Sequence, residues 1–357
     1  MNYELTYFLF ACVAIIFSVV INGLFLRFSR NLGMRNLDDS MIRWATSQKP
    51  ALGGFSFYIL FLVSVIAYVI IFDTTSVFHD IKLIGVLIAC TLGFFLGLTD
   101  DAYNTRPVLK FVTQFMCGII LIATGTVINF FDSLILNYIL TLFWVVGIMN
   151  SINMLDNMDA ITTNVSIFII LSCILVNARF HDLGNVYLLI MIGVAAGLAG
   201  FLFFNWNPSK MYMGDTGSQF LGVFLSAIGI IYLWNAPPGE GLVPFKQIIV
   251  ILIAFLLPIV DTTTVTINRL RKKQSPFVGG RDHTTHHLSY YGLSDKQVAL
   301  FFISISLISL FFNYLIHYNI EYWYYIHTLL FAFYALLVFI FLFYLTQKYK
   351  GPKKDNP

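Results

Sequence analysis

Two adjacent carboxylates, Asp100 and Asp101, close a long apolar segment and are followed by Arg106 and Lys110. Adjacent helix residues point about 100° apart, so one carboxylate can face a cleft while the other binds a basic side chain or a backbone donor. An acid at membrane level is costly unless it is paired, hydrated or metal-bound, which makes the pair a candidate functional site. Taken alone, a pair that only solvates the following loop is an equally good interpretation.

A second polar segment, NSINMLDNMDA, places Asn153, Asp156 and Asn157 at i, i+3 and i+4, on one face of a helix. Asp159 follows Asp156 by three more residues. Carboxylate and amide oxygens suit Mg²⁺ or Mn²⁺ and the hydroxyls of a sugar. A short polar cap between two apolar segments is the competing interpretation.

A third carboxylate, Asp215, lies between Gly214 and the run Thr216-Gly217-Ser218, just before another apolar segment. Glycines allow close backbone approach, and the N–H groups of a helix N-terminus can bind a phosphate. A carboxylate there can hold the cation that bridges this phosphate. An ordinary capped helix start explains the hydroxyls but not an acid among glycines.

The longest polar segment is rich in basic residues and histidines. Its candidates for phosphate binding are Arg281, His283, His286 and His287. We expect them to bind a diphosphate, because two negative phosphates need cations from the protein. A zinc cluster is one alternative, although no Cys supports it, and contact with anionic lipid head groups is another. Asp261, in the apolar segment before this loop, is best explained as a buried acid paired with Arg269 or a polar neighbour.

Long apolar segments separate these polar sites. The chain is 58% hydrophobic and only 11% charged, far from the composition of a water-soluble domain. A helix needs about 20 apolar residues to cross a bilayer, so we predict an all-α, polytopic membrane bundle of about eleven spans. The predicted spans lie at about 7–26, 51–72, 83–98, 110–127, 134–150, 161–177, 186–204, 217–234, 247–266, 297–316 and 323–346.

The charged residues orient this bundle. Glu4 precedes the first apolar segment and Arg27 follows it, which predicts an uncleaved span with the N-terminus outside. Of the 21 Lys and Arg residues, only Lys82, Arg179 and Lys246 then lie outside, as the positive-inside rule requires. The candidate site residues all fall on the cytoplasmic face.

We expect one integral-membrane domain, residues 1–346, and a short basic cytoplasmic tail, residues 347–357. The same orientation predicts that Asp73 and Glu240 face outward while Lys272 and Lys353 face the cytoplasm.

Five segments in this order, SQKPALGG, GLTDDAYNTRPVLKFVTQ, NMLDNMDA, MGDTGS and the histidine loop, resemble the polyprenyl-phosphate N-acetylhexosamine-1-phosphate transferases of glycosyltransferase family 4. This family includes bacterial undecaprenyl-phosphate GlcNAc-1-phosphate transferases and phospho-MurNAc-pentapeptide translocases. The resemblance spans about residues 43–296. It implies an active site on the cytoplasmic face and Mg²⁺ or Mn²⁺ as the cofactor.

The resemblance also implies individual roles. Asp100 contacts or deprotonates a lipid phosphate with Asp101 as its partner, Asp215 is the principal metal ligand beside Asn153, and His286 joins this catalytic set. The residues implied to bind substrate are Lys49, Lys110, Asn153, Asp156, Asp159, Arg281, His283 and His287.

Three positions depart from the family pattern. Asn157 and Ala160 stand where glycine is usual, and Lys49 lies in Gln-Lys-Pro-Ala rather than a Thr-Pro form. The loop at residues 282–287 reads DHTTHH rather than His-x-His-His, which displaces His283 by one position.

Helical spacing would still place His283 on the face of His286, and local pairing of His283 with Asp282 is the alternative. We therefore expect Ala substitutions to be severe at His286 and His287, intermediate at His283 and mild at Thr284.

The implied reaction is attack by a polyprenyl-phosphate oxygen on the β-phosphate of a UDP-activated amino sugar, UDP-GlcNAc before others, with release of UMP. The implied setting is the bacterial inner membrane, at the first membrane step of envelope polysaccharide synthesis. Phospho-MurNAc-pentapeptide and rarer amino sugars are alternative donors. A transporter is the rival class, but its acids should reach both faces of the membrane. No nucleic-acid partner is expected, and a homodimer is left open.

Overall fold

The computed structural model describes residues 3–29, 49–72, 76–181, 183–237, 245–275 and 280–349, and within these ranges it holds helices and no β-strand. Asp73, Glu240 and Lys353, whose sides were predicted, lie outside the described residues. The α-helices are α1 (Tyr3–Ser29), α2 (Gly53–Phe72), α3 (Ile81–Tyr103), α4 (Pro107–Ala123), α5 (Leu134–Leu155), α6 (Ile161–Phe180), α7 (Val186–Asn205), α8 (Gly214–Ile228), α9 (Lys246–Ala254), α10 (Leu256–Arg271), α11 (Thr284–Tyr291), α12 (Asp295–Tyr318) and α13 (Tyr325–Lys348). A 3₁₀ turn, η1 (Ser76–His79), precedes α3, and a π-helical turn, η2 (Gly229–Trp234), extends α8.

The predicted polytopic bundle is confirmed. In the described part of the chain, nine helical segments are long and apolar enough to cross a membrane, and α9 with α10 forms a tenth if the pair is one span. The 17-residue α4 is a shorter apolar helix. Helices are expected here because every backbone N–H and C=O in hydrocarbon must be paired within the protein.

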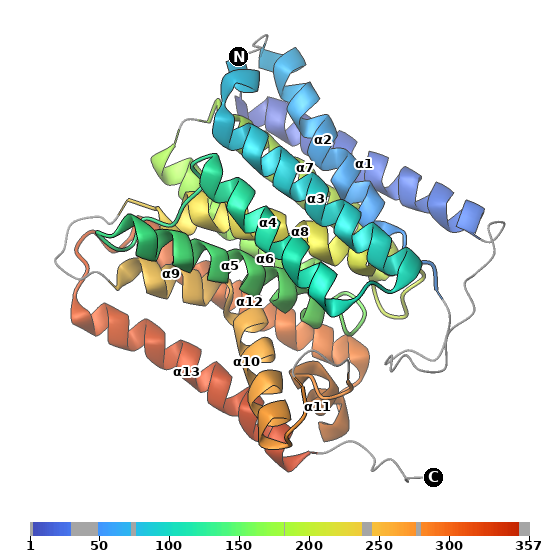
Figure 1. The fold of residues 1–357 in the computed structure, drawn as a ribbon, viewed down its shortest axis with the longest axis vertical. Coiled ribbons are helices and arrows are strands. Elements are labelled where there is room, and N and C mark those ends of the chain that lie inside the picture. The colour runs from blue at the N-terminus through green and yellow to red at the C-terminus, as the bar shows by residue number, and fades with distance from the viewer. Residues whose placement is uncertain are drawn as a thin grey trace.

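One predicted span, 247–266, is wrong as a continuous helix. The chain breaks at Phe255, and α9 and α10 are bent by 80°. Figure 1 shows α10 running across the direction of the other long helices, toward α11. This turn matters for the site because α10 carries Asp261 to the start of α11.

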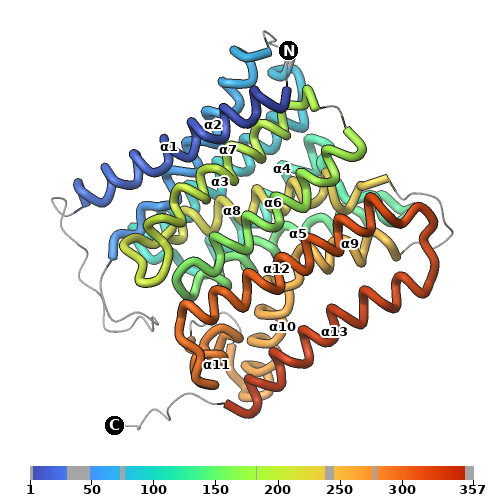
Figure 2. The backbone as a smooth tube through the Cα atoms, turned by 180° about the vertical axis from the view of Figure 1, so that it is seen from behind, coloured from blue at the N-terminus to red at the C-terminus, as the bar shows by residue number. Residues whose placement is uncertain are grey.

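Helix α8 lies at the centre of the bundle (Figure 1). Nearly all of its residues, and of those in η2 that extends it, are buried. It packs against α2, α3 and α5. Helices α12 and α13 lie on another side, and α11 sits beside the last part of α13 in both views (Figure 2). The first residues of α8 are therefore surrounded by the ends of several other helices.

The orientation can be tested on two described and exposed residues. Asp132 lies between α4 and α5, and Lys272 follows α10. We expect a cysteine at 132 to react with an impermeant maleimide added to intact cells, and a cysteine at 272 to react only after the cells are opened. The background should lack reactive native cysteines. Labelling of position 272 from outside would contradict the orientation.

Candidate active site

Asp100 is held in place by the way α3 ends. Asn104 adopts the left-handed conformation, with φ of 50°, and its N–H bonds to the Asp100 carbonyl. The chain then turns back, so that the N–H and hydroxyl of Thr105 donate to Asp100 Oδ1 at 2.8 and 2.7 Å. Lys110, in the first turn of α4, forms an ion pair with Asp100 Oδ2. The Asp100 side chain is thus fixed, and only 6% of the residue is exposed.

Asp101 caps another helix. Its Oδ1 accepts from the N–H of Asp215 at 3.0 Å, and its Oδ2 accepts from the N–H and hydroxyl of Thr216 at 2.8 and 2.7 Å. A carboxylate on the free N–H groups of a helix N-terminus is stabilising through both hydrogen bonds and the helix dipole. We therefore interpret Asp101 as the residue that positions Asp215, whereas the resemblance had implied a catalytic partner of Asp100.

Glycines bring the backbones of α2 and α3 onto the start of α8. A Cβ on Gly97 would lie 2.1 Å from the backbone oxygen of Asp215, and a Cβ on Gly54 would lie 2.4 Å from the backbone nitrogen of Gly217. Gly214 itself has a φ of 73°, which favours glycine. The close backbone approach predicted from the glycines around Asp215 is confirmed.

Asp215 faces three polar side chains from three helices. Asn153 of α5 donates its Nδ2 to Asp215 Oδ1 at 2.7 Å and to Ser218 Oγ at 2.9 Å. Lys110 Nζ lies 3.8 Å from Asp215 Oδ2, and the Asp100 carboxyl is within hydrogen-bond reach. Two adjacent carboxyl groups beside one ammonium group leave an excess of negative charge, which a cation or a shared proton must offset.

These residues fit a magnesium site of the kind found in phosphoryl-transfer enzymes. Such sites hold Mg²⁺ by one or two carboxylates, with water and substrate phosphates completing the octahedron. Asp100 and Asp215 supply two carboxylates, while no group of three His, Cys, Asp or Glu ligands occurs among the described residues. The amide nitrogen of Asn153, not its oxygen, faces Asp215. This geometry makes Asn153 a residue that orients Asp215 rather than a first choice of metal ligand.

The two carboxylates around the loop between α5 and α6, Asp156 and Asp159, lie in different surroundings. Asp156, half-buried, ends α5 one turn beyond Asn153. Asp159 instead accepts from the Ser209 N–H and hydroxyl at 2.9 and 2.8 Å and from Asn207 Nδ2 at 3.0 Å. Those bonds tie down the loop between α7 and α8, which gives Asp159 a structural role, and its contact with substrate stays a prediction.

Lys49 joins the same loop. Its ammonium donates to Ser209 Oγ at 3.0 Å, lies 4.0 Å from Asp159 and sits over the Tyr212 ring, 5.1 Å from the centroid. Ala160 keeps a left-handed φ of 65° and donates its N–H to Asn205 Oδ1 at 3.1 Å. Ala160 thus adopts the left-handed conformation that glycine favours.

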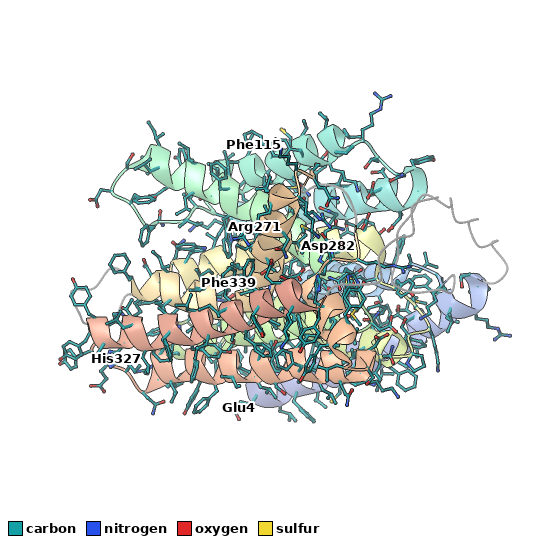
Figure 3. The ribbon with its side chains drawn as sticks, turned by 90° about the horizontal axis from the view of Figure 1, so that it is seen from below. Glu4, Phe115, Arg271, Asp282, His327 and Phe339 are labelled. Atoms are coloured by element: carbon teal, nitrogen blue, oxygen red, sulfur yellow. The ribbon has the colours of Figure 1, made fainter. Side chains whose placement is uncertain are left out.

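Asp261 anchors the histidine loop, and sequence reasoning missed this role. Its Oδ2 lies 2.8 Å from His283 Nδ1, and its Oδ1 accepts from the N–H and hydroxyl of Thr284 at 2.8 and 2.6 Å. Asp261 is 1% exposed. The predicted buried acid is confirmed, and of the two kinds of partner left open it has polar neighbours, because Arg269 instead binds Asp282 through two hydrogen bonds of 2.9 and 2.7 Å. Figure 3 shows Asp282 beside the end of α10, where Arg271 also lies.

His283 lies outside the helical register predicted for it, because it precedes α11 in an extended conformation, with φ of −74° and ψ of 158°. Its Nδ1 faces Asp261, and its ring still packs edge to face on the His286 ring, with centroids 5.4 Å apart. The alternative of local pairing with Asp282 is wrong, because Arg269 occupies that carboxylate. Burial raises the pKa of Asp282, but the Arg269 hydrogen bonds and charge outweigh it and hold the pKa below its usual value.

Helix α11 reaches the acidic segment through threonine. The Thr285 hydroxyl donates to Asn157 Oδ1 at 2.5 Å, and Asn157 lies one helical turn beyond Asn153. His286 is buried next to this contact, within hydrogen-bond reach of the Asn157 backbone. His287 instead approaches the backbone carbonyl of Tyr349, after α13. The structure thus places His286 toward the acidic segment and His287 toward the C-terminal helix.

One further feature lay outside the sequence-based prediction, and a second concerns Arg281, which was predicted to bind phosphate. Buried amides join three helices beneath the carboxylates: Gln114 Nε2 lies 3.2 Å from Gln219 Oε1, and Asn150 Nδ2 lies 2.9 Å from Gln114 Oε1. Arg281 is exposed, and its backbone carbonyl accepts from the Tyr290 hydroxyl at 3.2 Å. A polar residue recurring within an apolar span was the signal that could have identified the amides.

Comparison with known proteins agrees with this geometry. Residues 83–233, which contain Asp100, Asn153 and Asp215, match the family model described as Glycosyl transferase family 4. A probable undecaprenyl-phosphate N-acetylglucosaminyl 1-phosphate transferase of Bacillus subtilis strain 168 is 31% identical over 269 residues, covering 72% of this chain and 71% of the relative. The chain belongs to the polyprenyl-phosphate N-acetylhexosamine-1-phosphate transferase family.

Other relatives of this transferase differ in the names of their substrates. A decaprenyl-phosphate N-acetylglucosaminephosphotransferase of Mycobacterium leprae is 25% identical over 277 residues, with 70% of this chain and 69% of the relative covered. A phospho-N-acetylmuramoyl-pentapeptide-transferase of Staphylococcus epidermidis is 27% identical over 292 residues, with 72% and 82% covered. The resemblance seen in the five motifs is confirmed, and the transporter is set aside.

The buried histidine predicts a pH dependence of the transferase's stability. Burial, together with the nearby His283, lowers the pKa of His286 from 6.5 to about 3. Between these values the unfolded chain takes up a proton that the folded chain excludes, so stability falls as pH falls through this window. From pH 7 to pH 5 the loss from this residue should be about 2 kcal/mol.

The effect can be measured as the melting temperature of the purified protein at pH 7 and pH 5. His286→Gln removes the titrating ring, so its melting temperature should fall less across this range than that of the wild type. His327→Gln, which changes a histidine at the start of α13, is the matched control and should keep the wild-type slope. Parallel slopes for wild type and His286→Gln would contradict the assignment.

Proposed function

We propose that this protein transfers GlcNAc-1-phosphate from UDP-GlcNAc to undecaprenyl phosphate or a related polyprenyl phosphate, releasing UMP, at the cytoplasmic face of the plasma membrane. The observation that carries this proposal is the convergence of Asp100, Asp215 and Lys110 from three different helices on one charged site. The printed name of the Bacillus subtilis relative supports the GlcNAc donor and the lipid acceptor.

The nucleophile is an oxygen of the polyprenyl phosphate, which attacks the β-phosphorus of the UDP-sugar. A new P–O bond forms, the bond from the β-phosphorus to the bridging oxygen breaks, and UMP leaves with that oxygen. Because the nucleophile is already an anion, the reaction needs positioning and charge neutralisation more than proton removal. The products are UMP and a lipid-linked pyrophosphoryl sugar.

Different residues of this chain provide the positioning and the charge neutralisation. Lys110 neutralises part of the phosphate charge, and its ion pair with Asp100 places the ammonium at the mouth of the site. Asp101 fixes the start of α8, whose N-terminal dipole favours a nearby phosphate. Asp215 and Asp100 would hold Mg²⁺, which would supply positive charge against the negative charge that develops on the phosphates.

The histidine helix serves the donor side. At neutral pH the lowered pKa leaves His286 uncharged, so it can donate a hydrogen bond to a phosphate oxygen but supplies no positive charge. Asn157 contacts α11 through Thr285, and Asp156 lies next to it at the end of α5. Through Asp156 we assign this loop to nucleotide-sugar binding.

The proposal is tested by UMP release from the purified protein with undecaprenyl phosphate, Mg²⁺ and a panel of UDP-sugars. We expect UDP-GlcNAc to be the best donor, and Asp100→Asn to reduce the maximal rate more than it changes the donor KM. If UMP were released only from UDP-MurNAc-pentapeptide, the proposed reaction would stand but its donor would be UDP-MurNAc-pentapeptide and not UDP-GlcNAc. No release from any UDP-sugar, by protein that is folded and monodisperse, would refute the function.

A further inference from the structure

Two buried basic residues lie at the end of the bundle opposite the carboxylates. Lys246 opens α9 and His317 lies in the last turn of α12, and they are only 6% and 5% exposed. Helix α6 ends beside them, because the Phe180 ring meets the His317 ring edge to face, with centroids 5.8 Å apart. Helices α9 and α12 pack together here. These residues play no part in the proposed reaction.

Both groups lack the partners that burial demands. Neither ring nitrogen of His317 has a hydrogen-bond partner in the described structure. The Lys246 ammonium lies over the Trp323 ring, 6.0 Å from its centroid, and no described carboxylate pairs with it. Glu321, two residues before Trp323, is exposed and forms no ion pair with a described residue. Buried polar groups are normally hydrogen-bonded, so these two point to a ligand.

A third cation borders the same aromatic rings. The Arg179 guanidinium lies 5.8 Å from the centroids of both Phe180 and Tyr318. Arg179 and Lys246 are two of only three basic residues that the sequence places on the outer side. Basic residues are scarce on that side of a membrane protein, so two of them beside the pair formed by Phe180 and His317 need a local reason.

The charge of the cluster formed by Lys246, His317 and Arg179, and its level in the membrane, indicate which ligand it binds. An ammonium beside the imidazole repels a metal cation, which excludes the histidine as a metal ligand. An ammonium, an imidazole N–H and a guanidinium together match the several oxygens of a phosphate. Trp and Tyr rings at helix ends mark the head-group level of a membrane, where lipid phosphates lie.

We propose that Lys246 and His317, with Arg179 at the rim, bind one phosphate group at the outer surface of the membrane. The lipid head group of phosphatidylglycerol and free inorganic phosphate share this chemistry, and the position of the rings favours the lipid. The site is separate from the candidate active site, which lies at the other ends of the helices. Its occupant would hold α6, α9 and α12 together where no described ion pair does so.

The test compares lipid retention by native mass spectrometry of the full-length protein purified with phosphatidylglycerol or phosphatidylcholine. We expect the wild type to retain phosphatidylglycerol in preference, and Lys246→Gln with His317→Gln to reduce that retention at least about tenfold. Lys82→Gln removes the third outward basic residue, which is exposed and lies outside the cluster, and should retain the lipid like the wild type. Unchanged UMP release by the double variant would show that it is folded.

If the double variant fails to fold, Arg179→Gln provides a second test of the site. The Arg179 side chain is exposed, so this substitution should not disturb folding. It should reduce phosphatidylglycerol retention about threefold. If millimolar inorganic phosphate raises the melting temperature of the wild type but not of the variants, and lipid retention is equal, the ligand is free phosphate. Equal lipid retention and no response to phosphate in wild type and variants would overturn the site.

Discussion

Asp215→Asn is expected to lower UMP release at least about 100-fold while the protein still folds. Loss of residues that only orient metal ligands typically costs about 10 to 100-fold, and Asp215 is proposed to contact the metal itself. The amide keeps an oxygen for Asn153 Nδ2, now 2.7 Å from Asp215 Oδ1, so the start of α8 should be preserved. The measurement is the UMP release rate as a function of Mg²⁺ concentration.

Asp132→Asn is the matched control, since it removes an exposed carboxylate on the opposite side of the bundle. It should keep the wild-type rate and the wild-type Mg²⁺ dependence. A nearly normal rate for Asp215→Asn, or full wild-type activity in excess EDTA, would show that the reaction does not use a cation at this carboxylate.

Asp261→Ala is expected to have the second large effect, although Asp261 is not among the residues proposed to touch substrate. Its removal leaves His283 Nδ1 and the Thr284 N–H buried without their carboxylate, and a buried polar group left without its partner costs about 1–3 kcal/mol. Helix α11 would then lose its fixed start. We expect the donor KM to rise about tenfold or more, with a lower melting temperature.

Two variants test whether Asp261 positions α11 for donor binding or only stabilises the fold. Asp261→Asn keeps an acceptor for Thr284 and should be milder than Asp261→Ala in both measurements. Thr284→Ala removes a hydroxyl that donates to Asp261 at 2.6 Å, and should cost about 1 kcal/mol of stability. A donor KM that stays normal in Asp261→Ala would show that α11 does not bind the donor.

These contacts change the order of effects expected from the histidine spacing. Thr284 was expected to be the mildest position of the loop, yet it shares Asp261 with His283 and so belongs beside it. His287 was expected to match His286, yet it faces the Tyr349 carbonyl. We now expect His286→Ala to affect donor binding and His287→Ala to affect mainly the contact of α11 with α13.

The sequence determined the helices, their order and the end of the bundle that holds the chemistry. In hydrocarbon each backbone polar group must be paired within its own segment, so a long apolar run leads to a helix almost regardless of its neighbours. Charge asymmetry then orients the helices, and the carboxylates at their inner ends follow. Asp100, Asn153 and Asp215 could therefore be placed on one face before any tertiary contact was known.

The tertiary structure decided which partner each of these polar residues has. Asp101 caps α8, Asp159 holds the loop before α8, and Asp261 joins α10 to the start of α11 through His283 and Thr284. Each of these pairs joins helices or loops far apart in the sequence, and its geometry depends on how rigid helices cross and where they bend. Residue spacing within one helix carries no information about those crossings, because it fixes only the face on which a side chain lies.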